Sequence, residues 1–253
     1  MSIHGFKDQV VWIIGASSGI GHALACELDG QGAILALSAR SQNDLDQLNQ
    51  SLGNRHKVFC LDITDADLTQ RTAHAISSAL GRIDRVIFLA AIYTPMQTEK
   101  LNLPVVKKIV ETNLTGAFHV TQAVLPLLRE QTGFSQFALC ASVAGYTGLP
   151  GGQPYSATKA ALINLAETLY AEYKDHIDIK LINPGFVRTA LTDKNTFKMP
   201  MMIEPEQAAQ EIAKGLRSSH FEIHFPKAFT TFLKLIRILP YPLAFWVTRK
   251  IKP

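Results

Sequence analysis

Short apolar runs alternate with longer amphipathic stretches along most of this 253-residue chain. Strands separated by helices form βαβ units, and such units produce a parallel sheet with helices on both faces. We therefore predict an α/β fold, a single doubly wound domain whose parallel sheet has about seven strands. The expected strands are Val10–Ile14, Ile34–Ser38, Lys57–Cys60, Val86–Leu89, Gln136–Cys140, Asp178–Ile182 and Phe221–Phe225. The expected helices are Ile20–Leu28, Leu45–Leu52, Asp67–Leu80, Val105–Leu128, Tyr155–Tyr173 and Pro205–Leu216.

The composition indicates a globular protein, with 47% hydrophobic and 18% charged residues, which excludes a disordered chain. Cys26, Cys60 and Cys140 each lie within or beside an apolar stretch and form neither a disulfide framework nor a zinc pattern. We therefore expect buried thiols, a cytoplasmic location and no metal site. The first apolar run leads straight into a glycine loop, so we expect a strand there rather than a signal peptide.

Positive charge gathers at the C-terminal end of the chain. No acidic residue follows Glu222, whereas six of the 25 basic residues do, so the body up to and including Glu222 has a net charge of −2 although the chain has +4. A nucleic-acid-binding protein would need a basic face with base-reading or stacking residues. The body shows no such face, and we expect no nucleic-acid partner.

A glycine-rich loop follows the first expected strand and precedes the first expected helix. Such a turn suits a dinucleotide: Gly15 leaves the strand sharply, Gly19 lets amides approach a pyrophosphate, and Gly21 lets the helix pack closely. The alternative is a glycine-rich turn without a ligand. The residues predicted to contact the phosphates are Gly15, Ser17, Ser18, Gly19, Ile20 and Gly21.

Two further positions bear on the cofactor. Where NAD-binding sites carry an acid at the end of the second strand, this chain has Arg40, which favours the 2′-phosphate of NADP(H). The alternative is a solvated loop arginine. After the third strand, the Asp62 carboxylate beside Ile63 is expected to reach the adenine amine, with a helix N-cap as the alternative.

Ser142, Tyr155 and Lys159 form the candidate catalytic set. Tyr155 and Lys159 are four residues apart on an expected helix, so both project from one face. A free phenol has a pKa of about 10, and a neighbouring ammonium is expected to lower that pKa. Ser142, at the end of the preceding strand, is placed to donate to the oxygen that Tyr155 protonates.

These motifs resemble the short-chain dehydrogenase/reductase family in its compact single-domain form, over about Lys7 to Leu216. They stand in the family's order: Gly15, Gly19-Ile20-Gly21, Asp62, Asn113, Ser142, Tyr155 with Lys159, and Asn183-Pro184-Gly185 leading to Thr189. The resemblance implies a Rossmann domain with strand order 3-2-1-4-5-6-7. It also implies a homo-oligomer, a dimer or tetramer, that pairs the helices expected at Val105–Leu128 and Tyr155–Tyr173.

The resemblance also implies roles for single residues. Tyr155 would be the general acid in reduction and the base in oxidation, and Ser142 would hold the substrate oxygen. Lys159 would bind the nicotinamide ribose, and Asn113 would fix a relay water. The nicotinamide carboxamide would be held by Pro184, Gly185, Val187 and Thr189. Taken singly, the alternatives are a helix bend at Asn113, a strand end at Ser142 and a helix cap at Thr189.

Two positions depart from the family pattern. Ile14 replaces the usual Thr, and Phe88-Leu89-Ala90-Ala91 replaces the usual Asn-Asn-Ala-Gly. We expect Ile14 and this run to compensate each other through an apolar contact between neighbouring strands. Backbone contacts from Ala90 and Ala91 to the cofactor are still expected, although Ala91 adds a Cβ near the ribose.

The resemblance implies that the segment after Thr189 is a flap over the substrate. Its Phe and Met side chains favour an apolar substrate, since Met fills irregular apolar volumes well. The alternative is that these side chains pack in the core. The residues predicted to line the substrate pocket are Tyr93, Val143, Phe197, Met199 and Met202.

We divide the chain into a catalytic domain, residues 1–226, and a basic amphipathic tail, residues 227–253. In the tail, Phe229, Phe232, Leu233, Ile236 and Leu239 are expected on one helical face, opposite Thr230, Lys234 and Arg237. It is too charged and interrupted to span a membrane, which takes about 20 apolar residues. Peripheral membrane contact is one alternative, and a lid or subunit arm is the other.

Together these features predict an NADP(H)-dependent oxidoreductase that transfers a hydride between nicotinamide and a small hydrophobic carbonyl or secondary alcohol substrate. One rival is a 3-oxoacyl-thioester reductase, which should have basic residues at the pocket mouth for a phosphorylated carrier arm. The other rival is a non-catalytic NADP(H)-binding sensor or scaffold, which has no need of a tuned phenol at Tyr155.

Overall fold

The computed structural model describes residues 5–195, 197 and 199–250. Within them, one parallel seven-stranded sheet has the order β3-β2-β1-β4-β5-β6-β7, which confirms the predicted α/β fold and strand order. β1 is buried along its whole length, as expected for a parallel strand covered on both faces. The strands are β1 (Val10–Ile14), β2 (Ile34–Ala39), β3 (Lys57–Cys60), β4 (Arg85–Phe88), β5 (Gln136–Cys140), β6 (Asp178–Pro184) and β7 (Glu222–Phe225).

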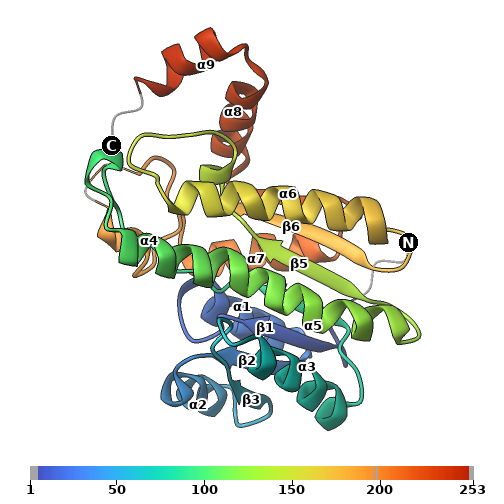
Figure 1. Cartoon of the computed structure of the whole chain (residues 1–253). Coiled ribbons are helices and arrows are strands. Elements are labelled where there is room, and N and C mark those ends of the chain that lie inside the picture. Colours follow the sequence, from blue (N-terminus) through green and yellow to red (C-terminus); the bar gives the residue numbers. More distant parts are fainter. Residues whose placement is uncertain (1–4, 196, 198, 251–253) are drawn as a thin grey trace.

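Helices cover both faces of the sheet, because alternate residues of the strands point to opposite sides. Trp12 and Ile14 pack in one core cluster, with α3 (Ala66–Leu80), α5 (Gly116–Glu130) and α6 (Tyr155–Tyr173). Val11 and Ile13 pack in the other, with α1 (Gly19–Gly30), α2 (Gln42–Ser51) and α7 (Pro205–Leu216). Figure 1 shows α5 and α6 crossing the front of the sheet.

The helix expected at Val105–Leu128 is interrupted. It consists of α4 (Leu103–Val110), a π-helical turn (Glu111–Thr115) and α5. π-Helical turns inside α-helices often occur at functional sites, and this turn contains Asn113.

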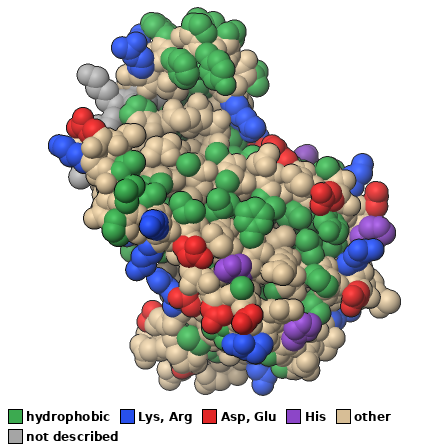
Figure 2. All heavy atoms as spheres, in the orientation of Figure 1, with side chains coloured by type: hydrophobic (Ala, Val, Ile, Leu, Met, Phe, Trp, Pro, Cys, Tyr) green, Lys and Arg blue, Asp and Glu red, His purple; other side chains and the backbone are tan. Residues whose placement is uncertain are grey.

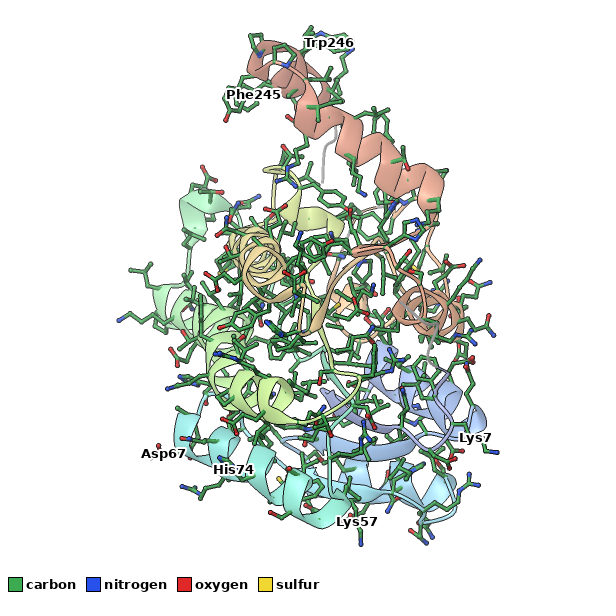
Figure 3. The ribbon with its side chains drawn as sticks, turned by 90° about the vertical axis from the view of Figure 1, so that its right-hand side faces the viewer. Lys7, Lys57, Asp67, His74, Phe245 and Trp246 are labelled. Atoms are coloured by element: carbon green, nitrogen blue, oxygen red, sulfur yellow. The ribbon has the colours of Figure 1, made fainter. Side chains whose placement is uncertain are left out.

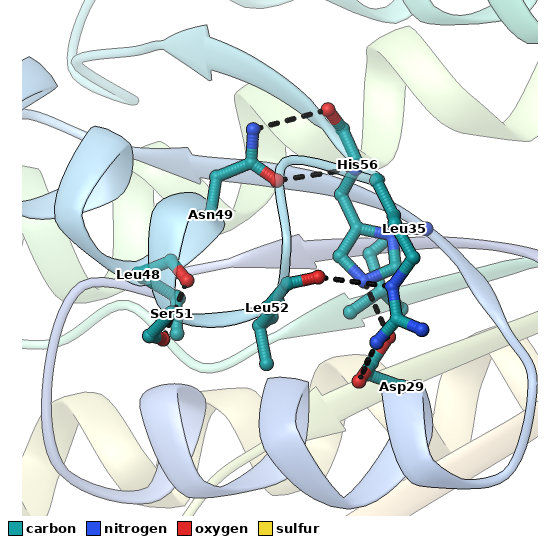
Figure 4. Close-up of polar contacts among 8 residues, drawn as sticks. Asp29, Leu35, Leu48, Asn49, Ser51, Leu52 and His56 are labelled. Atoms are coloured by element: carbon teal, nitrogen blue, oxygen red, sulfur yellow. Dashed lines mark hydrogen bonds and ion pairs between the residues drawn. The ribbon is translucent and has the colours of Figure 1, made fainter.

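A polar cluster fixes the loop between α2 and β3 to α1 (Figure 4). The carboxylate of Asp29 pairs with the guanidinium of Arg55 and with the ring of His56, at 2.7 and 3.0 Å. The Asn49 side chain bonds both backbone groups of His56, and the His56 ring accepts from the Leu35 amide. These contacts hold β2 and β3 in place at the edge of the sheet.

The tail forms α8 (Lys227–Ile238) and α9 (Tyr241–Thr248), which stand above the body in Figure 1. The predicted packing face of α8 is partly wrong: Thr230 is buried with Leu233 and Ile236, whereas Phe232 and Leu239 are exposed. Thr230 is buried because its hydroxyl meets His224 of β7, with Oγ1 2.6 Å from Nδ1. The boundary at residue 226 stays a prediction.

Two other expectations, on the burial of the thiols and on membrane-spanning helices, can be compared with the structure. The prediction of three buried thiols is wrong for Cys26 and Cys60, which are exposed because they lie on the outer side of α1 and on the edge strand β3, whereas Cys140 is buried. No helix in the described part of the chain has the length and hydropathy to cross a membrane.

Candidate active site

A cleft of about 600 Å³ lies at the carboxyl ends of the strands. It opens where the strand order reverses between β1 and β4, the usual ligand position in an open α/β sheet. Its lining includes every residue that the sequence predicted for the cofactor: Gly15, Ser17, Ser18, Gly19, Ile20, Gly21, Arg40, Asp62, Ile63, Ala90, Ala91, Tyr155, Lys159, Pro184, Gly185, Val187 and Thr189.

The glycine turn forms one wall of the cleft and tolerates no side chain at its key positions. Gly15 has φ +96°, and a Cβ there would lie 2.7 Å from the Ala90 amide nitrogen. A Cβ on Gly21 would lie 2.0 Å from the Gly15 carbonyl oxygen. Ser18 gives α1 no side-chain cap, and the first turn of α1 holds no acidic residue. The N-terminal amides of α1 therefore remain available to an anion.

Arg40 stands at the end of β2 on the rim of the cleft. Its side chain is exposed, and within the described residues its guanidinium makes no hydrogen bond or ion pair. The next residue, Ser41, caps α2 by accepting from the Asp44 amide. An uncommitted guanidinium beside a helix N-terminus is suited to a phosphate.

Asp62 follows β3 and is held by a local turn. Its Oδ1 accepts from the amide and the hydroxyl of Thr64, at 3.0 and 2.8 Å. Burial opposes ionisation, but these bonds and the charge of Arg40 lower the pKa of Asp62 overall. The N-cap of α3 is Asp65, which accepts from the Leu68 amide. The helix-cap alternative for Asp62 is therefore wrong.

Ser142, Tyr155 and Lys159 converge at the end of β5. Tyr155 begins α6 and Lys159 lies one turn further on. The Lys159 ammonium is 5.4 Å from the Tyr155 ring centroid and donates to the Cys140 carbonyl at 2.8 Å. The Ser142 hydroxyl forms a hydrogen bond with Tyr155, and all three residues line the cleft.

The electrostatics of this set differ from the expectation. Burial raises the pKa of the Tyr155 phenol, although the hydrogen bond with Ser142 works in the opposite direction. Burial also lowers the pKa of Lys159. The predicted lowering of the Tyr155 pKa by Lys159 is thus wrong for the chain's own groups. The physical reason is that Lys159 is itself desolvated and directs its ammonium to a backbone carbonyl.

Asn113 lies fully buried in the π-helical turn and does not line the cleft. Its Oδ1 accepts from the Ile92 amide at 2.8 Å, and its Nδ2 donates to the Ile92 carbonyl at 2.9 Å. Both polar groups of the side chain therefore hold the segment after β4, and Ile92 in this segment lines the cleft.

The segment after β6 closes over the glycine turn. The Gly185 amide donates to the Phe225 carbonyl at 2.7 Å, and a Cβ on Gly19 would lie 2.9 Å from the Thr189 methyl group. Thr192, which the sequence did not single out, donates to the Val187 carbonyl and accepts from the Thr189 amide. Thr192 thus sets the position of Val187 and Thr189, two of the four predicted carboxamide-binding residues.

Comparison with known proteins decides the family. The model of the family described as "short chain dehydrogenase" matches residues 9–199. This chain belongs to the short-chain dehydrogenase family. The membership covers the whole cleft except Pro205, since the other lining residues fall between Ile14 and Thr192.

Individual relatives agree with the oxidoreductase class of short-chain dehydrogenases. An uncharacterized oxidoreductase of Myxococcus xanthus is 31% identical over 244 residues, 95% of this chain and 96% of its own. The 11-beta-hydroxysteroid dehydrogenase 1A of Arabidopsis thaliana is 32% identical over 194 residues, 75% of this chain and 55% of its own. A short-chain dehydrogenase/reductase from Burkholderia phymatum, solved in complex with NAD, shares the fold with a TM-score of 0.83 at 21% identity, covering 92% of this chain and 94% of its own.

The departures from the short-chain dehydrogenase pattern lie together. Ile14 and Phe88 are register partners on the adjacent strands β1 and β4. Both are buried in the same core cluster, which confirms the predicted apolar contact; the energetic compensation stays a prediction. The Leu89 amide still donates to the Ile14 carbonyl at 2.9 Å, so the backbone leading to Ala90 and Ala91 keeps its place beside the cleft.

The residues predicted for the short-chain dehydrogenase substrate pocket are spread out, and none is in the lining of the 600 Å³ cleft. Tyr93 is closest to the chemistry, because its ring contacts that of Tyr155. Val143 is buried in a core cluster, and Met199 accepts a hydrogen bond from Asn195 at 3.4 Å. Phe197 contacts Phe186. With Met202, which is half-buried, these five assignments stay predictions.

Sequence reasoning missed a cluster of three aromatic side chains beside the cleft. Phe186 lies between Phe197 of the flap and Phe229 of α8, with ring centroids 5.9 and 5.5 Å apart. Phe229 also approaches Gly185 within about 3.1 Å of where a Cβ would stand. The adjacency of Phe186 to the Pro184-Gly185 motif was the available signal.

Proposed function

We propose that this protein is an NADP(H)-dependent oxidoreductase that transfers a hydride between nicotinamide and a hydrophobic carbonyl or secondary alcohol, with Tyr155 as the general acid and base. The observation that carries the proposal is the convergence of Ser142, Tyr155 and Lys159 in the cleft whose wall is the glycine turn.

The residues present fit a dinucleotide. Gly15 and Gly21 leave room only for backbone, and the uncapped N-terminus of α1 would bind the pyrophosphate. Lys159 would hold the nicotinamide ribose, while Pro184, Gly185, Val187 and Thr189 would hold the carboxamide. When bound, the cofactor supplies the hydride chemistry. The preference for NADP(H) rests on Arg40, whose guanidinium has no other partner within the described residues.

Tyr155 is the residue that transfers the proton in this proposal. In reduction the phenol gives its proton to the substrate oxygen, and in oxidation the phenolate takes it back. Burial raises the pKa of the Tyr155 phenol, so in the free protein Tyr155 holds this proton at neutral pH. Ser142 orients the substrate oxygen. Asn113 would act on a relay water indirectly, by holding the segment at Ile92 beside which the water would lie. Positioned proton transfer contributes about 10²–10⁴-fold in rate.

An apolar substrate is favoured by the aromatic group of Phe186, Phe197 and Phe229. Two relatives from Arabidopsis thaliana named 11-beta-hydroxysteroid dehydrogenase support the same class. A 3-oxoacyl-thioester reductase is disfavoured, because two cations near the cleft mouth are engaged and the third, Arg40, is assigned to the cofactor phosphate. Arg188 pairs with Glu204, and Lys194 donates to the Tyr93 carbonyl.

Homo-oligomerisation is part of the proposal. Exposed apolar side chains lie on the helices expected to pair: Leu103, Val110, Phe118 and Tyr170. Pairing of α4, α5 and α6 between two copies would cover them, as homodimer interfaces cover apolar surface.

The deciding experiment replaces Tyr155 by Phe, which keeps the ring and removes the proton. Turnover of a panel of hydrophobic ketones and alcohols, assayed with both cofactors, should fall about 10²–10⁴-fold, while NADPH binding measured by fluorescence stays nearly unchanged. Tyr170→Phe, on the exposed far part of the same helix, is the matched control and should keep full turnover. Turnover that persists in Tyr155→Phe would contradict the mechanism. If the parent protein binds NADPH but turns over none of the substrates, the alternative of a non-catalytic NADP(H)-binding sensor is favoured.

A further inference from the structure

The tail carries an unusual concentration of exposed apolar side chains. Eight of the fifteen large apolar side chains exposed in the described part of the chain lie between residues 232 and 246. We call this group the tail tip. It consists of Phe232, Leu235, Ile238, Leu239, Tyr241, Leu243, Phe245 and Trp246. Figure 2 shows hydrophobic side chains gathered on the lobe that α8 and α9 form.

The tail tip faces away from the protein's own body. α8 uses Thr230, Leu233 and Ile236 to pack on the core, so Phe232 and Leu235 point elsewhere. Phe245 and Trp246 lie at the far end of the tail in Figure 3, and Trp246 is 61% exposed. A lid over the cleft would bury these side chains against the body, whereas each of them is exposed.

The charged residues of the tail itself have one sign. No acidic residue follows Glu222 in the sequence, and the carboxylate of Glu222 is engaged by Lys234. Arg249 and Lys250 are exposed at the end of α9, with the Lys250 ammonium 3.6 Å from the Trp246 ring centroid. A second copy placed on this surface would bring like charges together, whereas an anionic surface would complement them.

We propose that the tail tip docks on an anionic lipid surface. Apolar side chains beside basic residues are the composition of helices that lie in a membrane interface. Trp246 and Tyr241 are residue types enriched at that depth, and Arg249 and Lys250 meet the lipid headgroups. The docked surface is α8 and α9, and the remainder of the protein stays in water.

Vesicle flotation tests the proposal. The full chain should float with vesicles of phosphatidylcholine and phosphatidylglycerol, float poorly with phosphatidylcholine alone, and be released as salt screens the attraction. Protein that stays at the bottom of the gradient with anionic vesicles would overturn the proposal.

Variants locate the docking surface. Phe245→Ser with Trp246→Ser, and separately Arg249→Glu with Lys250→Glu, should each lower the affinity for anionic vesicles about tenfold or more. Ile34→Ser removes an exposed apolar side chain on β2, outside both the tail and the helices proposed to pair, and should leave vesicle binding unchanged. Equal binding by all three variants, or an equal loss in Ile34→Ser, would place the contact elsewhere.

Tryptophan fluorescence gives a second readout. Trp12 is fully buried and Trp246 is exposed, so only Trp246 should shift to shorter wavelength with anionic vesicles, and Trp246→Phe should abolish the shift. The unchanged Trp12 emission reports that each variant is folded. The alternative occupant is a second copy of the chain. The proposal is rejected in its favour if the Trp246 emission shifts with protein concentration in the absence of lipid, and if Phe245→Ser abolishes both this shift and dimer formation.

Discussion

The ring of Tyr93 lies edge-on to the ring of Tyr155, with centroids 5.2 Å apart and planes at 68°. At its other end, the Tyr93 hydroxyl donates to Asn195 Oδ1 at 2.8 Å. The Tyr93 carbonyl accepts from the Lys194 ammonium at 2.8 Å. Tyr93 therefore connects the residue proposed to move the proton with the segment proposed to cover the substrate.

Replacing Tyr93 by Phe keeps the ring contact and removes the bond to the flap. Since a hydrogen bond contributes about 0.5–1.5 kcal/mol net, we expect KM to rise about 2–10-fold with kcat nearly unchanged. Asn195→Ala, which removes the same bond and also the bond to Met199, should raise KM at least as much. Steady-state kinetics check both variants, and a fall in kcat without a rise in KM would contradict the connection.

Arg40→Asp should shift the cofactor preference from NADP(H) toward NAD(H). Hydrogen bonds to charged groups contribute about 1.5–3 kcal/mol, so the ratio of kcat/KM values for the two cofactors should change at least about tenfold. Arg129→Asp is the control, because Arg129 is an exposed arginine at the C-terminal end of α5, away from the cleft. An unchanged ratio in Arg40→Asp would reject the phosphate assignment.

The Ile14–Phe88 pair predicts coupling between two substitutions. Phe88→Asn places an amide in an apolar cluster and should lower the free energy of unfolding by about 3–5 kcal/mol. Ile14→Thr should cost about 1–2 kcal/mol. The double variant restores the polar residue types usual in the family. Its loss of unfolding free energy should therefore be about 0.5–3 kcal/mol smaller than the sum of the losses in the two single variants. Urea unfolding measures all three, and strictly additive costs would contradict the pairing.

His224 predicts how the stability depends on pH. Burial lowers the pKa of His224 to about 4, and the charges of Lys234 and Lys227 act in the same direction. An unfolded histidine titrates at about 6.5, so the unfolded chain takes up the proton first. The stabilisation is complete above about pH 6.5 and is lost as the pH falls toward the folded pKa.

The measurement compares the free energy of unfolding at pH 7 and pH 5 in the parent protein and in His224→Gln. Because the ring is partly solvated, we expect the parent to lose about 1 kcal/mol more than the variant over this interval. His56, whose pKa burial also lowers, titrates in both proteins and cancels. Equal losses in the two proteins would show that His224 is not desolvated.

Much of the fold and of the cleft could be predicted because it depends on local patterns. The alternation of apolar runs and amphipathic stretches predicted the seven strands that the described residues contain, and the turn from β1 to α1 required glycine at Gly15 and Gly21. Tyr155 and Lys159 share a helix face because they are four residues apart. Even the contact between Ile14 and Phe88 followed from the predicted adjacency of their strands.

Tertiary structure alone decided which face of α8 is buried and how Tyr155 titrates. The periodicity of α8 indicates one apolar face, but the face that is buried includes Thr230 and leaves Phe232 exposed, so periodicity alone did not identify it. The choice depends on Glu222 and His224 of β7, which meet Lys234 and Thr230. The pKa of Tyr155 depends on burial, which outweighs an ammonium that bonds the Cys140 carbonyl instead. The spacing of residues along the chain determines which side chains share a helix face. The desolvation of a side chain and its choice of partner depend on the groups that neighbouring elements of the fold place beside it.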